Sequence, residues 1–215
     1  MGVIAVPVKA LERSKSRMSP VLTPIERAAL SLAMLEDLLD ACRLQPGWDV
    51  WVVSSDEAVL EVAGTAGIRP VPETGRSLLE AVRQVERSMR SRSGPLAIVL
   101  ADLPFATTES IARALSTQAS VVAAAAGSDG GTNLLVRRPP TVIAARFGRA
   151  SFAKHRWAAR RAGVSFEEIR DPDLAFDLDT PEDLAEAVRR RRPGRTGTVC
   201  LELGLEERLR VATGA

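Results

Sequence analysis

Apolar residues in the first half of the chain alternate between short β-branched runs and longer stretches that repeat every three or four residues. The first run, residues 3–8, is almost wholly apolar, as expected of a strand buried on both faces of a parallel sheet. The stripe from Ile25 to Cys42 then predicts a long amphipathic helix, and Thr23 and Glu26 form a capping box at its start. Further strands are expected at residues 50–53, 68–71, 96–101 and 120–126, and further helices from about residue 56, at 78–89 and at 111–115. This alternation predicts an α/β fold of three layers, with a mostly parallel sheet and right-handed connections.

The pattern loosens after residue 126 into Gly-rich and Pro-rich segments, where the binding loops of α/β proteins usually lie. The last regular unit is a predicted strand at residues 174–179, which leads into a helix capped by Thr180. Four arginines at 189–192 end that helix, and they complement the helix dipole better than they indicate a nucleic-acid patch. We therefore expect one domain over residues 1–192 and a C-terminal tail of unknown role over residues 193–215.

The composition of the 215 residues is that of a globular chain, with 46% hydrophobic and 26% charged residues. A net charge of +2 argues against nucleic acid as a partner. No apolar stretch approaches the roughly 20 residues that span a bilayer, and no basic segment precedes Val3, so we expect neither a membrane anchor nor a signal peptide. The two cysteines, Cys42 and Cys200, and the single histidine, His155, are too few for a thiolate or multi-histidine metal site. These features predict a cytoplasmic protein without membrane partners.

A basic segment follows the first predicted strand and contains Lys9, Arg13, Lys15 and Arg17. Ligands of open parallel sheets bind beyond the carboxyl ends of the strands. Cations at this position suit a triphosphate and the charge of its transition state. The alternative is an ordinary solvated loop, but the position of Lys9 directly beyond a buried strand favours nucleotide binding.

Three aspartates are candidate ligands of a metal ion. Asp102 directly follows the predicted strand at 96–101, where a carboxylate can hold Mg²⁺ against a phosphate. The alternative role, a helix cap, is better filled by Thr107. Asp177 and Asp179 lie two residues apart on a predicted strand, so their side chains leave one face and can share a cation. A helix-start role explains Asp179 nearly as well.

Two glycine-containing segments are candidates for an anion site. Residues 129–133 follow a strand and offer backbone N–H groups together with the hydroxyl of Thr132. Gly148 allows close approach of a ligand, and Ser151 stands at the start of a predicted helix, where anions bind favourably. Each segment alone could be a turn or a cap. Their joint occurrence favours an anionic ligand.

With these residues assembled, the chain resembles the guanylyltransferases of coenzyme F-420 biosynthesis, the phosphoenolpyruvate or 2-phospho-L-lactate guanylyltransferase family, over about residues 3 to 190. The matching pieces are residues 6–9 with 15–17, 22–23 with 26–27, 54–56, 101–104, 131–133, 147–148 with 151 and 155, and 177–181. Molybdenum-cofactor nucleotidyltransferases share the acidic run at 177–184, but they carry a glycine-rich loop where this chain has the basic segment. Relatives often show Leu-Asn where this chain has Leu78 and Leu79, so a nucleotide contact of that asparagine does not carry over.

The resemblance implies a nucleotidyltransferase (Rossmann-like) fold, GTP as co-substrate, Mg²⁺ as the metal and a small phosphorylated carboxylic acid as acceptor. By motif, the acceptor phosphoenolpyruvate would be bound by Thr132, Gly148 and Ser151. The nucleotide would be bound by Lys9, Lys15, Arg17 and Asp56. The metal would be held by Asp102 together with Asp177 or Asp179.

We therefore expect an enzyme that transfers GMP from GTP to phosphoenolpyruvate and releases pyrophosphate. The same transfer to 2-phospho-L-lactate or 3-phosphoglycerate stays open, as does a homodimer. A phosphate monoester is already an anionic nucleophile, so the scarcity of histidine counts little against this chemistry. The alternative of a different class is a non-catalytic nucleotide-binding module on the same fold. The carboxylates of Asp102, Asp177 and Asp179 argue against it, since a sensor has less need of metal ligands.

Overall fold

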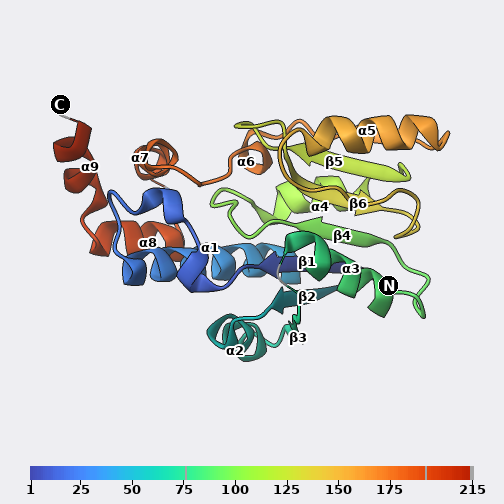
Figure 1. Ribbon diagram of the computed structural model, residues 1–215, viewed down its shortest axis with the longest axis horizontal. Coiled ribbons are helices and arrows are strands. Elements are labelled where there is room, and N and C mark those ends of the chain that lie inside the picture. The colour runs from blue at the N-terminus through green and yellow to red at the C-terminus, as the bar shows by residue number, and fades with distance from the viewer. Residues whose placement is uncertain (76, 192, 214–215) are drawn as a thin grey trace.

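The computed structural model describes residues 1–75, 77–191 and 193–213. Its centre is a sheet of seven strands in the order β3-β2-β1-β4-β6-β5-β7 (Figure 1). The strands are β1 Gly2–Val8, β2 Trp48–Ser54, β3 Arg69–Pro72, β4 Leu96–Val99, β5 Val121–Ala125, β6 Thr132–Arg137 and β7 Phe166–Glu168. Among these described strands, β6 runs antiparallel to both of its neighbours and the other pairs are parallel. The predicted mostly parallel sheet is confirmed.

Helices connect the strands and cover both faces of the sheet (Figure 1). The α-helices are α1 Pro24–Arg43, α2 Glu57–Thr65, α3 Leu78–Ser88, α4 Thr108–Ser116, α5 Ser151–Arg161, α6 Pro172–Ala175, α7 Pro181–Arg190, α8 Arg195–Glu202 and α9 Leu205–Thr213. Two short 3-10 helices, η1 Leu11–Arg13 and η2 Ser16–Met18, follow β1. In the described ranges, no helix has both the length and the apolarity that crossing a bilayer requires.

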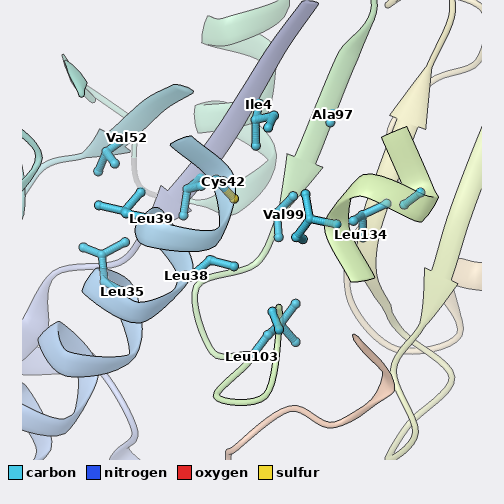
Figure 2. Packing of buried hydrophobic residues seen from close by; sticks show 14 of the residues in the cluster. Ile4, Leu35, Leu38, Leu39, Cys42, Val52, Ala97, Val99, Leu103 and Leu134 are labelled. Carbon is cyan, nitrogen blue, oxygen red and sulfur yellow. The ribbon is translucent and has the colours of Figure 1, made fainter. Parts of the chain in front are cut away.

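Alternate residues of the central strands face opposite layers. Ile4 and Val6 of β1 belong to a buried cluster with side chains of α1, α2 and α4, part of which Figure 2 shows. Val3 and Ala5 face the other way, into a cluster with side chains of α3 and α5. Burial on both faces explains why the sequences of these strands are continuously apolar rather than alternating. The predicted three-layer α/β fold is confirmed.

Helix α1 begins where its capping box predicts. The Thr23 hydroxyl accepts the N–H of Glu26 at 3.3 Å, and the Glu26 carboxylate accepts the N–H of Thr23 at 2.7 Å. The predicted apolar stripe is wrong at its first residue, because Ile25 is 83% exposed. Pro24 and Ile25 lie in the first turn, so the apolar contacts of α1 start one turn later.

The C-terminal helices bury a second side of α1. Leu30 and Met34 of α1 belong to a third cluster, which includes buried side chains of α7, α8 and α9. The carboxylate of Asp37 accepts two backbone N–H groups at the start of α8, each at 2.9 Å. The segment predicted as a tail therefore contains two helices that pack against α1 and α7. Residue 192, at the predicted boundary, and residues 214–215 lie outside the described residues, and the division into domain and tail stays a prediction.

The strand predicted at residues 174–179 is wrong. Asp171 and Pro172 start the short helix α6 instead, because the carboxylate of Asp171 accepts two backbone N–H groups of its first turn. Beyond α6 the chain joins none of the described strands, and it is held by the N–H of Leu178, which donates to the carbonyl of Asp102 at 3.0 Å. Asp177 and Asp179 thus lie in an irregular segment rather than on one face of a strand.

Strand β6 is a feature that the sequence pattern does not predict. All six of its residues are buried. Asn133 and Arg137 interrupt its apolar run. The Asn133 amide donates to the carbonyl of Leu174 at 2.9 Å. One guanidinium nitrogen of Arg137 donates to Glu86 at 2.6 Å and to the carbonyl of Ile143 at 3.1 Å, while its other two nitrogens have no hydrogen-bond partner among the described residues.

Candidate active site

The carboxyl ends of β1 and β4 open onto a cavity of about 920 Å³. Its walls come from the segment after β1, part of α1, the segments after β2 and β3, and the start of α3. The charged residues that line it are Lys9, Glu12, Lys15, Arg17, Glu73, Asp102 and Asp179. This volume lies within the range of cofactor and substrate sites, and it occupies the edge of the sheet where ligands of such folds bind.

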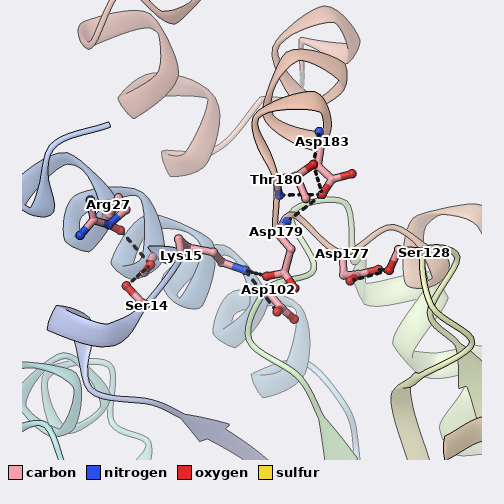
Figure 3. Close-up of polar contacts among 10 residues, drawn as sticks. Ser14, Lys15, Arg27, Asp102, Ser128, Asp177, Asp179, Thr180 and Asp183 are labelled. Atoms are coloured by element: carbon pink, nitrogen blue, oxygen red, sulfur yellow. Dashed lines mark hydrogen bonds and ion pairs between the residues drawn. The ribbon is translucent and has the colours of Figure 1, made fainter. Parts of the chain in front are cut away.

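Lys15 lies between two of the predicted acids (Figure 3). Its ammonium nitrogen is 3.2 Å from a carboxylate oxygen of Asp102 and 3.0 Å from one of Asp179. The Lys15 side chain is 7% exposed, so water screens these ion pairs little. The left-handed backbone of Lys15, with φ of 49°, turns the chain between η1 and η2. The structure thus joins one predicted nucleotide-binding residue to two predicted metal ligands.

The surroundings of Lys15 and Asp179 shift their pKa values in opposite directions. Burial alone would lower the pKa of Lys15, but the charges of Asp102 and Asp179 outweigh it, and the net pKa is raised. Burial alone would raise the pKa of Asp179, but Lys15, with smaller effects of Arg17 and Lys9, lowers it. Both groups therefore stay ionised around neutral pH.

Asp177 occupies a different environment from Asp179. Its carboxylate accepts the hydroxyl of Ser128 at 3.2 and 3.3 Å (Figure 3). Burial, and then repulsion by Asp102 and Asp179, raises the pKa of Asp177. Asp183 caps α7, as the capping box of Thr180 predicts.

These carboxylates can be tested against the Mg²⁺ that the family resemblance implies. One carboxylate oxygen of Asp102, Oδ1, is buried and has no hydrogen-bond partner. Within the described ranges, the acidic and other ligand side chains do not form a group of three or more that would hold a metal by themselves. Mg²⁺ is commonly held by one or two carboxylates together with substrate phosphates, so the residues present fit a metal that arrives with the nucleotide.

Of the other predicted nucleotide-binding residues, two line the cavity and one holds the backbone next to it. Lys9 and Arg17 line the cavity and are exposed. Asp56 caps α2 by accepting the N–H of Ala58 at 3.1 Å, and it accepts the N–H of Leu11 at 2.8 Å. Asp56 therefore anchors η1, which follows Lys9 in the chain.

Two of the three residues predicted to bind the acceptor meet in a buried cluster. The hydroxyls of Thr132 and Ser151 are 2.9 Å apart, and the Thr132 hydroxyl is 3.1 Å from Nδ1 of His155. Nε2 of His155 accepts the N–H of Arg146 at 2.8 Å. Burial, with smaller effects of Arg137 and two other cations, lowers the pKa of His155 to about 4, so the ring is neutral at neutral pH. We call Thr132, Ser151 and His155 the hydroxyl–imidazole cluster.

Gly148 lies beside this cluster. Its φ of 100° favours glycine, and its carbonyl accepts the N–H of Ser151 at 3.0 Å. The N–H groups of Ala150 and Phe152 donate to carbonyls of residues 129 and 130 at 3.3 and 3.2 Å. An acceptor phosphate at the start of α5 would therefore have to exchange these bonds for its own.

The hydroxyl–imidazole cluster lies at the same edge of the sheet as Asp102. Strand β6 runs antiparallel to β4, so its first residue, Thr132, stands beside the end of β4. The N–H of Leu100 donates to the carbonyl of Asn133 at 2.9 Å, which extends this pairing toward Asp102. Two predicted sites from separate parts of the sequence thus adjoin one another.

Sequence reasoning missed two residues that the structure places in this region. His155 appeared only as a member of a motif, because a lone histidine on a helix carries no signal of its partners. Glu73 lines the cavity directly after β3. The rule that singled out Asp102, an acid beyond a strand end, would also have found Glu73.

Solved structures that superpose on this chain identify the class of fold. A nucleotide-diphospho-sugar transferase from Desulfovibrio desulfuricans superposes with a TM-score of 0.80 at 20% identity, covering 98% of this chain and 97% of that chain. A nucleotidyl transferase from Methanothermobacter thermautotrophicus gives a TM-score of 0.57 at 18% identity, covering 87% and 96%. The chain has a nucleotidyltransferase fold.

The family follows from sequence. The model of the guanylyl transferase CofC-like family matches residues 1–195, and the chain belongs to that family. It is 38% identical to a phosphoenolpyruvate guanylyltransferase of Sphaerobacter thermophilus, over 86% of this chain and 91% of that protein. It is also 38% identical to a 2-phospho-L-lactate guanylyltransferase of Haloarcula marismortui, over 86% and 84%. A 3-phospho-D-glycerate guanylyltransferase of Phenylobacterium zucineum is 36% identical, over 88% and 91%.

Proposed function

We propose that this protein transfers GMP from GTP to phosphoenolpyruvate, as a step of coenzyme F-420 biosynthesis. Family membership and the names of its relatives support guanylyl transfer to a small phosphorylated acid. The observation that carries the proposal is the buried ammonium of Lys15 between the carboxylates of Asp102 and Asp179, at the edge of a cavity of about 920 Å³. A triphosphate needs such a cation, and a metal ion that accompanies it needs such acids.

The reaction is a displacement at the α-phosphorus of GTP. An oxygen of the acceptor phosphate forms a bond to that phosphorus, while the bond to the oxygen that bridges to the β-phosphate breaks. Pyrophosphate leaves with the electron pair, and the product is a phosphoanhydride. Since the acceptor oxygen is already ionised at neutral pH, no side chain has to remove a proton.

The chain's own residues relieve the repulsion between the two anions. Lys15 stays protonated and can move its hydrogen bonds from the carboxylates to the triphosphate, while Lys9 and Arg17 add positive charge at the mouth of the cavity. Mg²⁺, held by Asp102 with Asp179 or Asp177, would polarise the phosphates and stabilise the leaving pyrophosphate. Thr132, Gly148 and Ser151 would hold the acceptor in line with the α-phosphorus.

The acceptor is the part of the proposal for which relatives differ, since three different acids appear in their names. Purified protein is mixed with GTP, Mg²⁺ and one acid at a time, and both pyrophosphate and the guanylylated acid are measured. We expect turnover with phosphoenolpyruvate to exceed turnover with 2-phospho-L-lactate and 3-phosphoglycerate. A higher kcat/KM with either rival acid would replace the acceptor, and GTP binding without product from any acid would favour the non-catalytic module.

We also propose a cytoplasmic location. Cys42 and Cys200 are free and buried, and burial raises the pKa of Cys42 to about 12, which keeps this thiol protonated. Free thiols suit a reducing compartment. A homodimer stays a prediction, which a measurement of mass in solution tests.

A further inference from the structure

Glu73 stands at the end of the cavity opposite Asp102. It directly follows β3, and its N–H donates to the carbonyl of Ser54 at 2.8 Å, which fixes its backbone against β2. Its neighbours on this wall of the cavity are Gly75, Ser77, Leu78 and Ala81. Among the described lining residues, this wall thus consists of small and aliphatic side chains around the carboxylate of Glu73.

One carboxylate oxygen of Glu73 has no donor among the described residues. This oxygen, Oε1, is buried. Burial, and then the charge of Glu80, raises the pKa of Glu73. A buried carboxylate oxygen without a donor is costly, and a ligand that brings N–H groups would remove that cost.

Gly75 keeps the space beside this carboxylate open. A Cβ at residue 75 would lie 2.6 Å from Cβ of Glu80 and 3.1 Å from Oε1 of Glu73. Any larger residue would therefore crowd Glu73 against the start of α3.

The sheet order sets the distance between Glu73 and the cluster around Lys15. β3 and β4 are separated by β2 and β1, and three steps of about 4.8 Å give roughly 14 Å between their ends. An extended nucleoside triphosphate can lie across such a span, with its phosphates near Lys15 and its base near Glu73.

We propose that Glu73 reads the base of GTP by accepting the N1–H and the 2-amino group of guanine, with Leu78 and Ala81 against the face of the ring. This inference rests on the proposed function, because it takes GTP as the nucleotide. A carboxylate only accepts hydrogen bonds, and guanine presents two adjacent donors on its Watson–Crick edge. Adenine presents an acceptor at N1 and would meet the carboxylate with repulsion, so Glu73 selects guanine over adenine.

The test is equilibrium binding without acceptor acid, so that it does not depend on turnover. Affinities for GTP, ITP, ATP and 2′-deoxy-GTP are measured for the parent protein, for Glu73→Gln and for the control Glu61→Gln, at an exposed position of α2 away from the cavity lining. ITP lacks the 2-amino group, and we expect the parent to bind GTP about tenfold more tightly than ITP. Glu73→Gln should lose about thirtyfold in GTP affinity, the effect of removing hydrogen bonds to a charged group, and its GTP-to-ITP ratio should fall to within twofold. Glu61→Gln should keep the ratio of the parent.

Two results would overturn the proposal. One is a GTP-to-ITP ratio that Glu73→Gln leaves unchanged. The other is a change confined to 2′-deoxy-GTP, which would assign Glu73 to the ribose instead. If Glu73→Gln does not fold, the GTP-to-ITP affinity ratio is measured for Glu73→Asp instead, which keeps the charge but withdraws it by one methylene. A guanine preference that depends on Glu73, together with no product from any acid, would overturn the proposed transfer and leave the base recognition standing.

Discussion

The two parts of the candidate site hold their polar side chains by opposite means. Around Lys15, ionised groups from distant segments meet at the cavity, and the side chains of Asp102 and Asp179 keep 27% and 42% exposure. In the hydroxyl–imidazole cluster, neutral groups meet in complete or nearly complete burial, with Thr132 at 2% and His155 at 0% exposure. The first arrangement can exchange its partners for a ligand, whereas the second is satisfied within the protein. Substitutions around Lys15 should therefore cost activity with little loss of stability, whereas substitutions in the hydroxyl–imidazole cluster should cost stability and, at Ser151, acceptor binding as well.

The largest effect should come from Asp102→Asn. Turnover should fall at least a hundredfold, about 3 kcal/mol in the barrier, because the variant loses the charge of the proposed metal ligand. The melting temperature should stay close to that of the parent, since the amide fits the same space. Pyrophosphate release and thermal unfolding are the measurements, with the exposed Glu167→Gln as control. Near-normal turnover would remove Asp102 from the chemistry.

Next in size is His155→Phe, which removes both ring nitrogens from the hydroxyl–imidazole cluster. The N–H of Arg146 and the hydroxyl of Thr132 each lose a buried partner, so the free energy of unfolding should fall by about 2 to 3 kcal/mol. Urea unfolding measures it, and Lys154→Ala on the exposed side of α5 should change it by less than about 0.5 kcal/mol. A variant as stable as the parent would show that this cluster does not stabilise the fold.

Lys15→Met tests whether the buried cation handles the triphosphate. The methionine fills the space without the charge, so GTP affinity should fall about thirtyfold, roughly 2 kcal/mol, while the KM for the acid changes much less. Titration with GTP measures the GTP affinity, and initial rates at varied acid concentration measure the KM for the acid. Equal losses for both substrates would indicate that Lys15 only supports the fold.

Ser151→Ala tests the acceptor side of the same comparison. The KM for phosphoenolpyruvate should rise about tenfold, about 1.4 kcal/mol, and GTP binding without acid should stay within about twofold. Ser116→Ala, at an exposed position on α4, is the matched control. If GTP affinity and acid KM worsen together, Ser151 acts through α5 rather than through the acceptor.

The smallest effect is a pH dependence at Asp177. The pKa of this group is raised in the folded protein. Between the unfolded and the folded pKa values, the folded state binds more protons than the unfolded state, so stability falls as the pH rises through this interval. Above the interval, ionised Asp177 lowers stability. Asp177→Asn should therefore raise stability at pH 7 by less than about 1 kcal/mol, and the gain should vanish as the pH falls through the raised pKa. Unfolding curves at pH 7 and pH 4 measure it, and a gain that persists at pH 4 would contradict the assignment to ionisation.

The sequence was sufficient where local signals and sheet topology agree. Buried β-branched strands and capping boxes predicted the layers, and the rule that ligands bind beyond strand ends selected Lys15 and Asp102. It could not predict that Lys15 bridges Asp102 and Asp179, which are 87 and 164 residues away, because that contact depends on how distant segments pack. The wrong strand at 174–179 has a local cause: its apolar alternation looked like a strand, while Asp171 and Pro172 upstream form a helix start.

The contact between α1 and α8 also sets the order in which the molecule can assemble during synthesis. Asp37 and Arg195 are 158 residues apart, so α1 leaves the ribosome roughly 10 to 30 s before its partner at ordinary synthesis rates. During that interval Leu30 and Met34 face water, and so does Met18, which follows Lys15 in the chain and packs in the same cluster. The nascent chain thus carries an apolar helix surface through most of its translation, and the second ion pair of Lys15 forms only after residue 179 has been made.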